Sequence, residues 1–520
     1  MKRMWKMMIA MLLILSLSVG LIACAPKPSE KTFKNAQKDA FEEFVDQFLE
    51  GYALTDSGDV ASTTKMNVKL SEELLTMLRS LTGEQMNWIN DLVIQLDQNA
   101  KDGKMEEMLF LGYKDKELLS VKLLSDLANG KVFIGVPILS KKYLSPKQNV
   151  LAGGATAASS ALMSGKLFQY LPAEKDMEKL LNRYYDLVMN AVTGVTFESG
   201  KLSAGGVEQE CTVYKLELTV DQLQAIAKEF LEALKKDEDL KKVVYDLANG
   251  MLKENIIPPG ETADGVYNEF VAAIDDALED LAAAEKDNTV ALKWTTYMTK
   301  KSETIGTKLE LLDEESAGTI FVGKAQNGEN IGVEVYVESE GKKALEIKGE
   351  LTEKKQVQNG TYELKVDGKS MLFVDVKDLS AKQLEEGYID GTFKICPSKG
   401  LIDEIGIEGF GPGLMFASMA IEVDVAQTKE QTTLAMTLLN NGAAYVGINL
   451  EIQEKKATDV TLPSDNEVTD NTKNWVQQHT NSTELKNQLK NSGLPASITE
   501  QLDFFVDEFL RSLANPYPFL

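Results

Sequence analysis

Hydrophobic residues recur at helical spacing through much of the first half of the chain. From Phe33 to Tyr52, apolar side chains return every three or four positions, which predicts an amphipathic helix. The same spacing predicts helices over residues 173–192, 219–250 and 263–286. Strand-like alternation lies between them. It predicts one strand over 60–71, three strands over 104–139, and a hairpin over 195–219 that turns at Gly205-Gly206.

After residue 289 the period of the hydrophobic pattern changes from about 3.6 to about 2, and it stays there to residue 458. Roughly ten consecutive strands are predicted, and this spacing is typical of an antiparallel meander that is curved or partly closed. Many of these strands alternate polar and apolar residues, so one face of the sheet should be wet. The expected turns contain the pairs Asn327-Gly328, Asn359-Gly360, Asp367-Gly368, Asp390-Gly391 and Asn441-Gly442.

These patterns predict an α+β fold: a long, curved, half-barrel-like antiparallel sheet packed against helices. In sequence order we expect a mixed helix and strand domain over 33–289 and a β-meander domain over 290–458. A polar linker and a last helix over 459–520 should follow, with Ser497 and Glu500 as a capping box. The pattern leaves open whether 33–458 forms one continuous sheet or two domains.

The first 23 residues have the layout of a secretory signal. Lys2, Arg3 and Lys6 form a cationic start, and residues 7–23 carry no charge. This apolar stretch is at the short limit for a membrane-spanning helix, which needs about 20 residues. We therefore predict a signal peptide over 1–23.

The end of this leader, Leu21-Ile22-Ala23-Cys24, resembles the lipobox of bacterial lipoproteins. The resemblance implies cleavage between Ala23 and Cys24, with a diacylglyceryl group and its palmitate-type chains on the Cys24 thiol. Residues 24–32, with Pro26 and Pro28, would then form a short extended tether. The expected location is the outer surface of the cell membrane of a Gram-positive-type bacterium. An uncleaved anchor and an ordinary secreted protein are the alternatives.

The charge balance restricts the partners. The formal net charge is −25, and it becomes −28 once Lys2, Arg3 and Lys6 are removed with the leader. Such a chain is a poor match for nucleic acid and for direct docking on anionic lipid. The expected membrane contact is therefore the lipidated N-terminus, and the pattern names no protein partner.

The chemistry-bearing residues are few. Cys211 and Cys396 lie in strand-like segments and, in an exported protein, are candidates for a disulfide; two free buried thiols are the alternative. His479, the single histidine, lies in a polar stretch, which argues against a serine triad and against a histidine-bearing zinc site. We predict no metal and no cofactor.

Two motif matches fail in context. The Ser-x-x-Lys of residues 62–65 begins a strand rather than a helix, and no Lys-Thr-Gly accompanies it. The Gly-Lys-Ser of residues 368–370 lacks the upstream glycine of a phosphate loop and reads as a hairpin turn. We predict no catalytic residues and a protein that is not an enzyme.

A hydrophobic cavity is the remaining candidate site. Residues 405–425 are the most apolar stretch outside the leader, and residues 149–168 are rich in small side chains. A loop that enters a core strand is the simpler reading of 405–425, whereas Met and Phe suit an adaptable pocket. The candidate lining residues are Phe410, Leu414, Met415, Phe416 and Met419.

Helices followed by a long meander behind a lipobox resemble the LolA and LppX/LprG lipoprotein-carrier fold, with "GKVFIGVPILSKKYL" (130–144) as the most similar segment. The chain also resembles large uncharacterised lipoproteins of clostridia-type bacteria. The carrier resemblance implies a curved sheet that binds an acyl chain or lipid, so non-catalytic binding or carriage of a hydrophobic or amphiphilic ligand is the first functional hypothesis. A structural or protein-interaction component of the envelope and a solute-binding subunit of a transporter are the alternatives.

Overall fold

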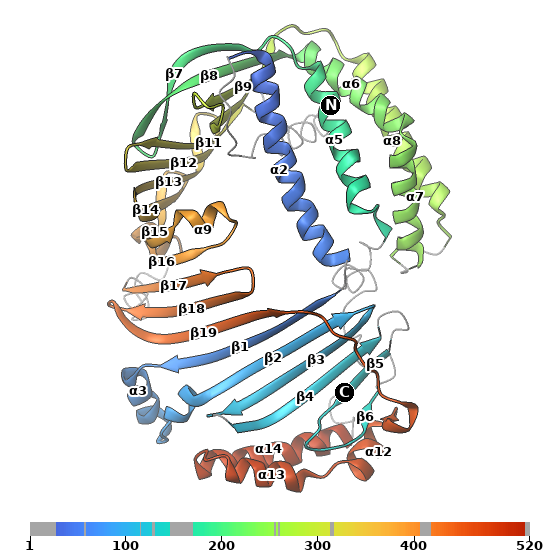
Figure 1. Ribbon diagram of the computed structural model, residues 1–520, viewed down its shortest axis with the longest axis vertical. Helices are drawn as coiled ribbons and strands as arrows, with labels where there is room; N and C mark the ends of the chain where they lie inside the picture. The colour runs from blue at the N-terminus through green and yellow to red at the C-terminus, as the bar shows by residue number, and fades with distance from the viewer. Residues whose placement is uncertain are drawn as a thin grey trace. The chain divides into compact units, whose positions relative to one another are not determined.

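The fold is described from a computed structural model (Figure 1). The structure describes residues 28–56, 59–114, 116–126, 131–145, 170–253, 256–257, 260–312, 317–405 and 418–514. They divide into two compact units. Unit 1 holds the described residues within Met1–Asp56, Ala155–Val374 and Ser398–Glu404, and unit 2 holds those within Ser57–Gly154, Asp375–Pro397 and Ile405–Leu520.

Unit 1 contains a meander in which each strand pairs antiparallel with the next, from β7 to β14. Strand β15 (Lys369–Ser380), which continues into unit 2, and the short helix α10 (Lys399–Ile405) follow it. The meander strands are β7 (Thr196–Ala204), β8 (Val207–Thr219), β9 (Val290–Met298), β10 (Thr304–Leu311), β11 (Gly318–Asn327), β12 (Asn330–Ser339), β13 (Lys342–Lys354) and β14 (Val357–Val366).

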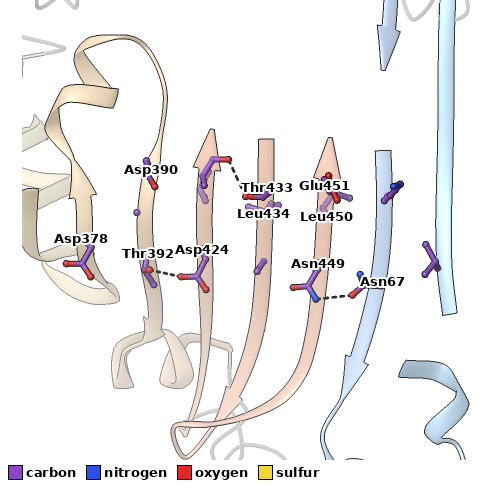
Figure 2. A pocket seen from close by; sticks show the side chains of 16 residues that line it. Asn67, Asp378, Asp390, Thr392, Asp424, Thr433, Leu434, Asn449, Leu450 and Glu451 are labelled. Atoms are coloured by element: carbon purple, nitrogen blue, oxygen red, sulfur yellow. Dashed lines mark hydrogen bonds between the residues drawn. The ribbon is translucent and has the colours of Figure 1, made fainter. Parts of the chain in front are cut away.

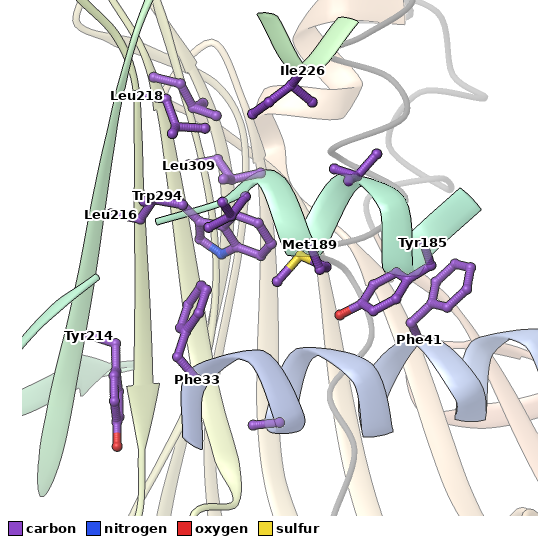
Figure 3. Packing of buried hydrophobic residues seen from close by; sticks show 14 of the residues in the cluster. Phe33, Phe41, Tyr185, Met189, Tyr214, Leu216, Leu218, Ile226, Trp294 and Leu309 are labelled. Carbon is purple, nitrogen blue, oxygen red and sulfur yellow. The ribbon is translucent and has the colours of Figure 1, made fainter. Parts of the chain in front are cut away.

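Helices cover one face of strands β8, β9 and β10. In the core between them, Phe33 meets Trp294 edge-on with ring centroids 5.4 Å apart, and Phe41 stacks on Tyr185 at 4.3 Å (Figure 3). Trp294 is 1% exposed, so this cluster is a true core. The covering helices are α2 (Glu30–Asp56), α5 (Glu174–Ala191) and α6 (Val220–Lys236). Helix α8 (Ala263–Ala283) packs on α6, and α7 (Glu238–Lys253) packs on α8.

The sheet of unit 1 is curved so strongly that its first hairpin packs on later strands. β7 and β8 lie against β11 and β12, around a second core that includes Leu202, Cys211 and Phe321. The turn of this hairpin packs directly against the backbone of β12. A Cβ on Gly332 would lie 1.9 Å from the carbonyl oxygen of Ala204, a separation that no side chain tolerates.

The close approach at Gly332 gives the first prediction. Gly332→Ala forces the β7–β8 hairpin away from β12, so the free energy of unfolding should fall by about 2–3 kcal/mol. Urea unfolding measures the loss, and hydrogen exchange should rise in the amides of β7 and β8. Gly447→Ala is the control, because its Cβ meets only ordinary contacts from 3.6 Å. Equal stability of the two variants would contradict the close backbone contact between the β7–β8 turn and Gly332.

Asp237 separates α6 from α7, where the sequence pattern predicted one continuous helix. Its Oδ1 accepts hydrogen bonds from the backbone N–H groups of Asp239 and Leu240, at 2.9 and 3.1 Å, which caps α7. Its Oδ2 accepts from the Tyr184 hydroxyl and pairs with Arg183, both at 2.7 Å, on α5. Burial raises the pKa of the Asp237 carboxyl, but these hydrogen bonds and the Arg183 charge outweigh it and lower the pKa below its usual value.

The second prediction follows from the lowered pKa of Asp237. Asp237→Asn should reduce the free energy of unfolding by about 1–3 kcal/mol at neutral pH, because the amide offers one acceptor oxygen instead of two and no charge to pair with Arg183. The ionised form stabilises the fold above the ordinary carboxyl pKa of about 4, and this contribution is lost as pH falls through the lowered folded value. The difference between wild type and variant in urea unfolding should therefore shrink in acid.

Asp239→Asn is the matched control. It removes the exposed partner of the same Arg183 and should change stability by less than about 0.5 kcal/mol. A stability difference for Asp237→Asn that is independent of pH would show that its carboxylate charge contributes nothing.

Unit 2 contains a sheet built from two distant parts of the chain. β1 pairs antiparallel with β2 on one side and with β19 on the other (Figure 1). From one end, the strands follow the order β16, β17, β18, β19, β1, β2, β3, β4, β5, β6, with β20 parallel to β6. They are β1 (Val60–Leu70), β2 (Leu92–Lys101), β3 (Lys104–Tyr113), β4 (Lys116–Asp126), β5 (Lys131–Gly135), β6 (Tyr143–Leu144), β16 (Asp390–Pro397), β17 (Met419–Gln427), β18 (Gln431–Asn440), β19 (Ala443–Lys455) and β20 (Val468–Thr469).

Short helices border this sheet, and two C-terminal helices cover one end of one face. Leu485, Leu489 and Leu510 of these helices pack with Tyr113 and Leu118. The helices are α3 (Glu72–Thr82), α9 (Ala381–Glu385), α12 (Thr472–Asn474), α13 (Ser482–Asn491) and α14 (Ala496–Ala514), with single turns η1 (Asn87–Asp91), η3 (Asp465–Glu467) and η4 (Trp475–His479).

The predicted fold class, α+β with a long curved antiparallel sheet packed against helices, is confirmed. The units differ from the sequential division at residues 289 and 458, because β1 joins strands from the end of the chain. The last helix begins at Ala496, so Ser497 lies in its first turn and not before it, and α13 was not foreseen.

Two of the predicted turns are wrong. Gly360 and Gly391 lie inside β14 and β16. A Cβ on either glycine would lie under 3.0 Å from the backbone of a neighbouring strand, so these glycines allow strands to approach rather than to turn. The predicted turns at Asp367-Gly368 and Asn441-Gly442 are confirmed, with positive φ at both residues of each pair.

Candidate functional site

The register of unit 2 produces one uninterrupted row of apolar side chains. Strand residues alternate between faces, so directly paired residues share a face. Met66 of β1 lies opposite Leu450 of β19 and opposite Ile94 of β2. Extended through the neighbouring pairs, the row consists of Val425, Leu434, Leu450, Met66, Ile94, Leu111 and Leu119, from β17 to β4. We call the side of the sheet that carries this row the apolar face.

Much of the apolar face is open to solvent. Ile94 is 37% exposed and Ile421 is 44% exposed, and Leu109 and Met436 are similar at 45% and 36%. Helices α13 and α14 cover only the end near Leu111. Exposed apolar patches on a globular protein mark either binding surfaces or sites prone to aggregation.

The opposite side of the same strands, which we call the polar face, carries two rows of mostly hydrophilic residues. They come from the positions between those of the apolar row, and three of them are small. The first row is Asp390, Ala426, Thr433, Glu451, Lys65, Gln95 and Phe110, and the second is Thr392, Asp424, Ala435, Asn449, Asn67, Val93 and Gly112.

Two adjoining hollows lie on the polar face. One has a volume of about 580 Å³ and reaches from β15 and β16 to β2, and Figure 2 shows its lining. The other has a volume of about 600 Å³ and extends over β1, β2, β3 and the start of β4. They share Lys65, Asn67 and Val93, so together they form one trough. The small side chains of Ala426 and Ala435 and the absence of one at Gly112 leave the space for it.

Polar groups in the trough retain unused hydrogen-bonding capacity. The Asn449 side-chain amide donates to the Asn67 carbonyl at 2.9 Å, and the Thr392 hydroxyl donates to Asp424 at 2.5 Å (Figure 2). The Asn67 NH₂ group and the Asn449 carbonyl are then still available. Among the described residues, the side chains of Lys65 and Asp390 have no hydrogen-bond or ion-pair partner.

Of the predicted cavity residues, Met419 is the one within the described part of the chain. It lies at the start of β17 with the same parity as Ile421, and therefore on the apolar face. Phe410, Leu414, Met415 and Phe416 lie outside the described residues, as does the segment 149–168. Ala23 and Cys24, the predicted cleavage and lipidation residues, also lie outside them.

Cys211 and Cys396 are free thiols, so the candidate disulfide is not formed in this structure. Cys211 points into the second core of unit 1, beside Leu202 and Val213. Cys396 is half-buried on β16 in unit 2. Burial raises the pKa of both thiols, which disfavours the reactive thiolate.

The described residues contain no cluster of three His, Cys, Asp or Glu side chains that could hold a metal ion. His479 lies in the single π-helical turn η4. Ser62 and Lys65 lie in β1, and Gly368 lies in a hairpin turn. Among the described helices, none combines the length and the apolar character that crossing a membrane requires.

No family model, curated protein or solved structure matches this chain. The features of this chain that bear on function are therefore the two faces of the sheet in unit 2.

The residues of the trough were missed at the level of sequence. Asn67, Asn449 and Asp424 look like ordinary solvated strand positions, and only the register brings them together. One signal was present: Phe110 stands at a polar position of an alternating strand, between Leu109 and Leu111.

Proposed function

We propose that this chain is a lipid-anchored extracytoplasmic protein that binds a hydrophobic or amphiphilic ligand on the apolar face of unit 2. The observation that carries the proposal is the apolar row from Val425 to Leu119, which crosses seven strands, β17, β18, β19, β1, β2, β3 and β4. Its residues are only partly buried, and Ile94 in the row and Ile421, Met436 and Leu109 beside it are exposed.

Covering this face is energetically favourable. Burying a large aliphatic side chain completely contributes about 1.5–3 kcal/mol, and the residues of the row are already partly buried by one another. Half of that gain at each of several positions is sufficient for a weak to moderate complex, after the cost of association. Met66 and Met436 add side chains that adapt to ligands of different shape.

The composition of the face favours an acyl chain over a protein. Interface cores are enriched in aromatic residues and arginine, whereas this row contains only Val, Leu, Ile and Met. The neighbouring row on the same face is polar at three positions, Gln427, Thr432 and Thr64, and apolar at Ile452, Leu96 and Leu109. The polar positions would suit the head group of an amphiphile. A lipid anchor at the lipobox would also hold the protein close to the membrane, which would be the source of the ligand.

The third prediction tests the apolar face directly. Cells that express the full chain are given a long-chain fatty acid that bears a photoactivatable diazirine, and adducts are mapped by mass spectrometry after irradiation. Adducts should concentrate on β17, β18, β19, β1 and β2. Met436→Glu should reduce them by about tenfold, because an unpaired carboxylate against an acyl chain costs more than 1.4 kcal/mol.

Thr433→Glu is the matched control on the same strand. It introduces the same residue on the polar face and should leave labelling unchanged. Labelling that is equal in both variants, or that avoids these strands, would contradict the proposed site.

The fourth prediction concerns the anchor. Cys24→Ala removes the thiol to which a diacylglyceryl group would be attached, so incorporation of labelled palmitate into the protein should fall to background. The uncleaved precursor should accumulate, and it should migrate on a gel as a larger protein because it retains the leader. Cys211→Ala serves as the control and should be labelled like the wild type. Palmitate labelling that persists in Cys24→Ala would refute the lipoprotein assignment.

A further inference from the structure

We propose that the trough on the polar face of unit 2 is a second binding site, for an extended and uncharged glycan chain. The chain would lie across the strands, from β16 to β3. This inference does not depend on the lipid-binding function, because alternate residues of the same strands form the two sites.

The shape of the trough suits a polymer. Its two hollows adjoin at Lys65, Asn67 and Val93, so the lining is continuous over seven strands, β16, β17, β18, β19, β1, β2 and β3. With neighbouring strands about 4.8 Å apart, the trough is about 29 Å long. A small solute would fill only a fraction of it, whereas a chain of several sugar units would extend along it.

The hydrogen-bonding groups suit sugar hydroxyls. A hydroxyl both donates and accepts, and the trough offers both functions side by side: the amides of Asn67 and Asn449 and the hydroxyl of Thr433. The NH₂ group of Asn67 and the carbonyl of Asn449 are the two amide groups left over after their mutual hydrogen bond. They are aligned on adjacent strands at the middle of the trough.

Phe110 provides the apolar element that such a site requires. Its ring lies on the polar face, paired with Gln95 on one side and Ser120 on the other. The face of an aromatic ring is negative, and the C–H groups on one side of a pyranose present a weakly positive, apolar surface to it. No other aromatic residue lines either of the two hollows.

The charges select among glycans. Asp390 and Asp424 lie at the β16 end of the trough, and Glu451 lies opposite Lys65 near its centre. Lysines predominate at the other end, which is lined by Lys69, Lys114, Lys116, Asp91 and Glu117. Asp390 has no ion-pair partner in the described residues. A polyanion laid across all seven strands would meet the carboxylates at one end, and a polycation would meet the lysines at the other, whereas an uncharged glycan is repelled at neither end.

Titration calorimetry with three probes of equal length tests the inference: chitohexaose, its de-N-acetylated form, and a hexamer of alginate. The full chain is isolated from membranes and held in detergent micelles. Chitohexaose should bind, and its amino form and the alginate hexamer should each bind about tenfold more weakly, because each charged chain meets like charges at one end of the trough. Binding of either charged hexamer as tightly as chitohexaose, or no binding of chitohexaose, would overturn the proposal.

Two variants locate the site. Phe110→Ala removes the stacking ring and should weaken binding of chitohexaose by about tenfold. Ala435→Phe fills the trough without removing any polar group and should abolish binding. Circular dichroism and thermal unfolding report whether each variant keeps its fold. If Phe110→Ala is destabilised, the Ala435→Phe variant still tests the site.

Phe393→Ala and Met436→Glu are the matched controls. Both change the opposite, apolar face of the same sheet and should leave glycan affinity unchanged. Glycan binding that survives Ala435→Phe, or that is lost in Met436→Glu, would overturn the assignment to the trough. The lipid-labelling result does not enter this comparison, so the two proposals can fail separately.

Discussion

The antiparallel ladder between β1 and β19 is the constraint on which unit 2 depends. It joins segments in which the paired residues Asn67 and Asn449 stand 382 positions apart, so it closes a very long loop before any of its contacts is gained. The ladder runs in register from Ala61 opposite Lys455 to Leu70 opposite Val446. Without it, the strands β16–β19 and β1–β5 would form two narrower sheets, each with another edge to protect.

The register of this ladder also determines which residues lie on the apolar face and which on the polar face. Met66 lies opposite Leu450, and the next pair, Asn67 with Asn449, belongs to the other face. A slip by one residue would exchange these sets and place Asn67 in the apolar row. The hydrogen bond between the two asparagine side chains, at 2.9 Å, favours the observed register on the polar face. Packing of Met66 with Leu450 favours it on the apolar face.

The sequence predicted the elements of this fold far better than their partners. Strict alternation identified β9–β19 as strands, and the apolar periodicity identified α2, α5 and α8, because each of these patterns is local. The neighbours of β1 could not be predicted, since pairing with β19 depends on a register that no single strand encodes. Glycine was also ambiguous: Gly368 makes a turn, whereas Gly360 admits a neighbouring backbone, and both follow a polar residue.

The same limit applies to the candidate site. Met419 was named from its apolar surroundings and lies on the apolar face, but the rest of that face was not recognised, because Leu434, Leu450 and Ile94 look like core residues in a strand that has a wet side. The polar trough required even more: its hollow comes from the small side chains of Ala426 and Ala435, on two different strands. A hollow is a property of rows across a sheet, and rows become visible only when the register is known.

The two units show how one pattern leads to two outcomes. In unit 1, β8 is apolar on both faces: Tyr214, Leu216 and Leu218 face the helices, and Cys211 and Val213 face β11. Both sides of that strand are therefore buried, and close backbone contact at Gly332 holds the curved sheet against itself. In unit 2, β18 and β19 alternate strictly, so one side is apolar and the other polar. An apolar ligand is favoured on one face of this sheet and a polar ligand on the other, so a single sheet is suited to bind two chemically different ligands. We therefore expect the binding surfaces of the protein in unit 2 rather than in the closed core of unit 1.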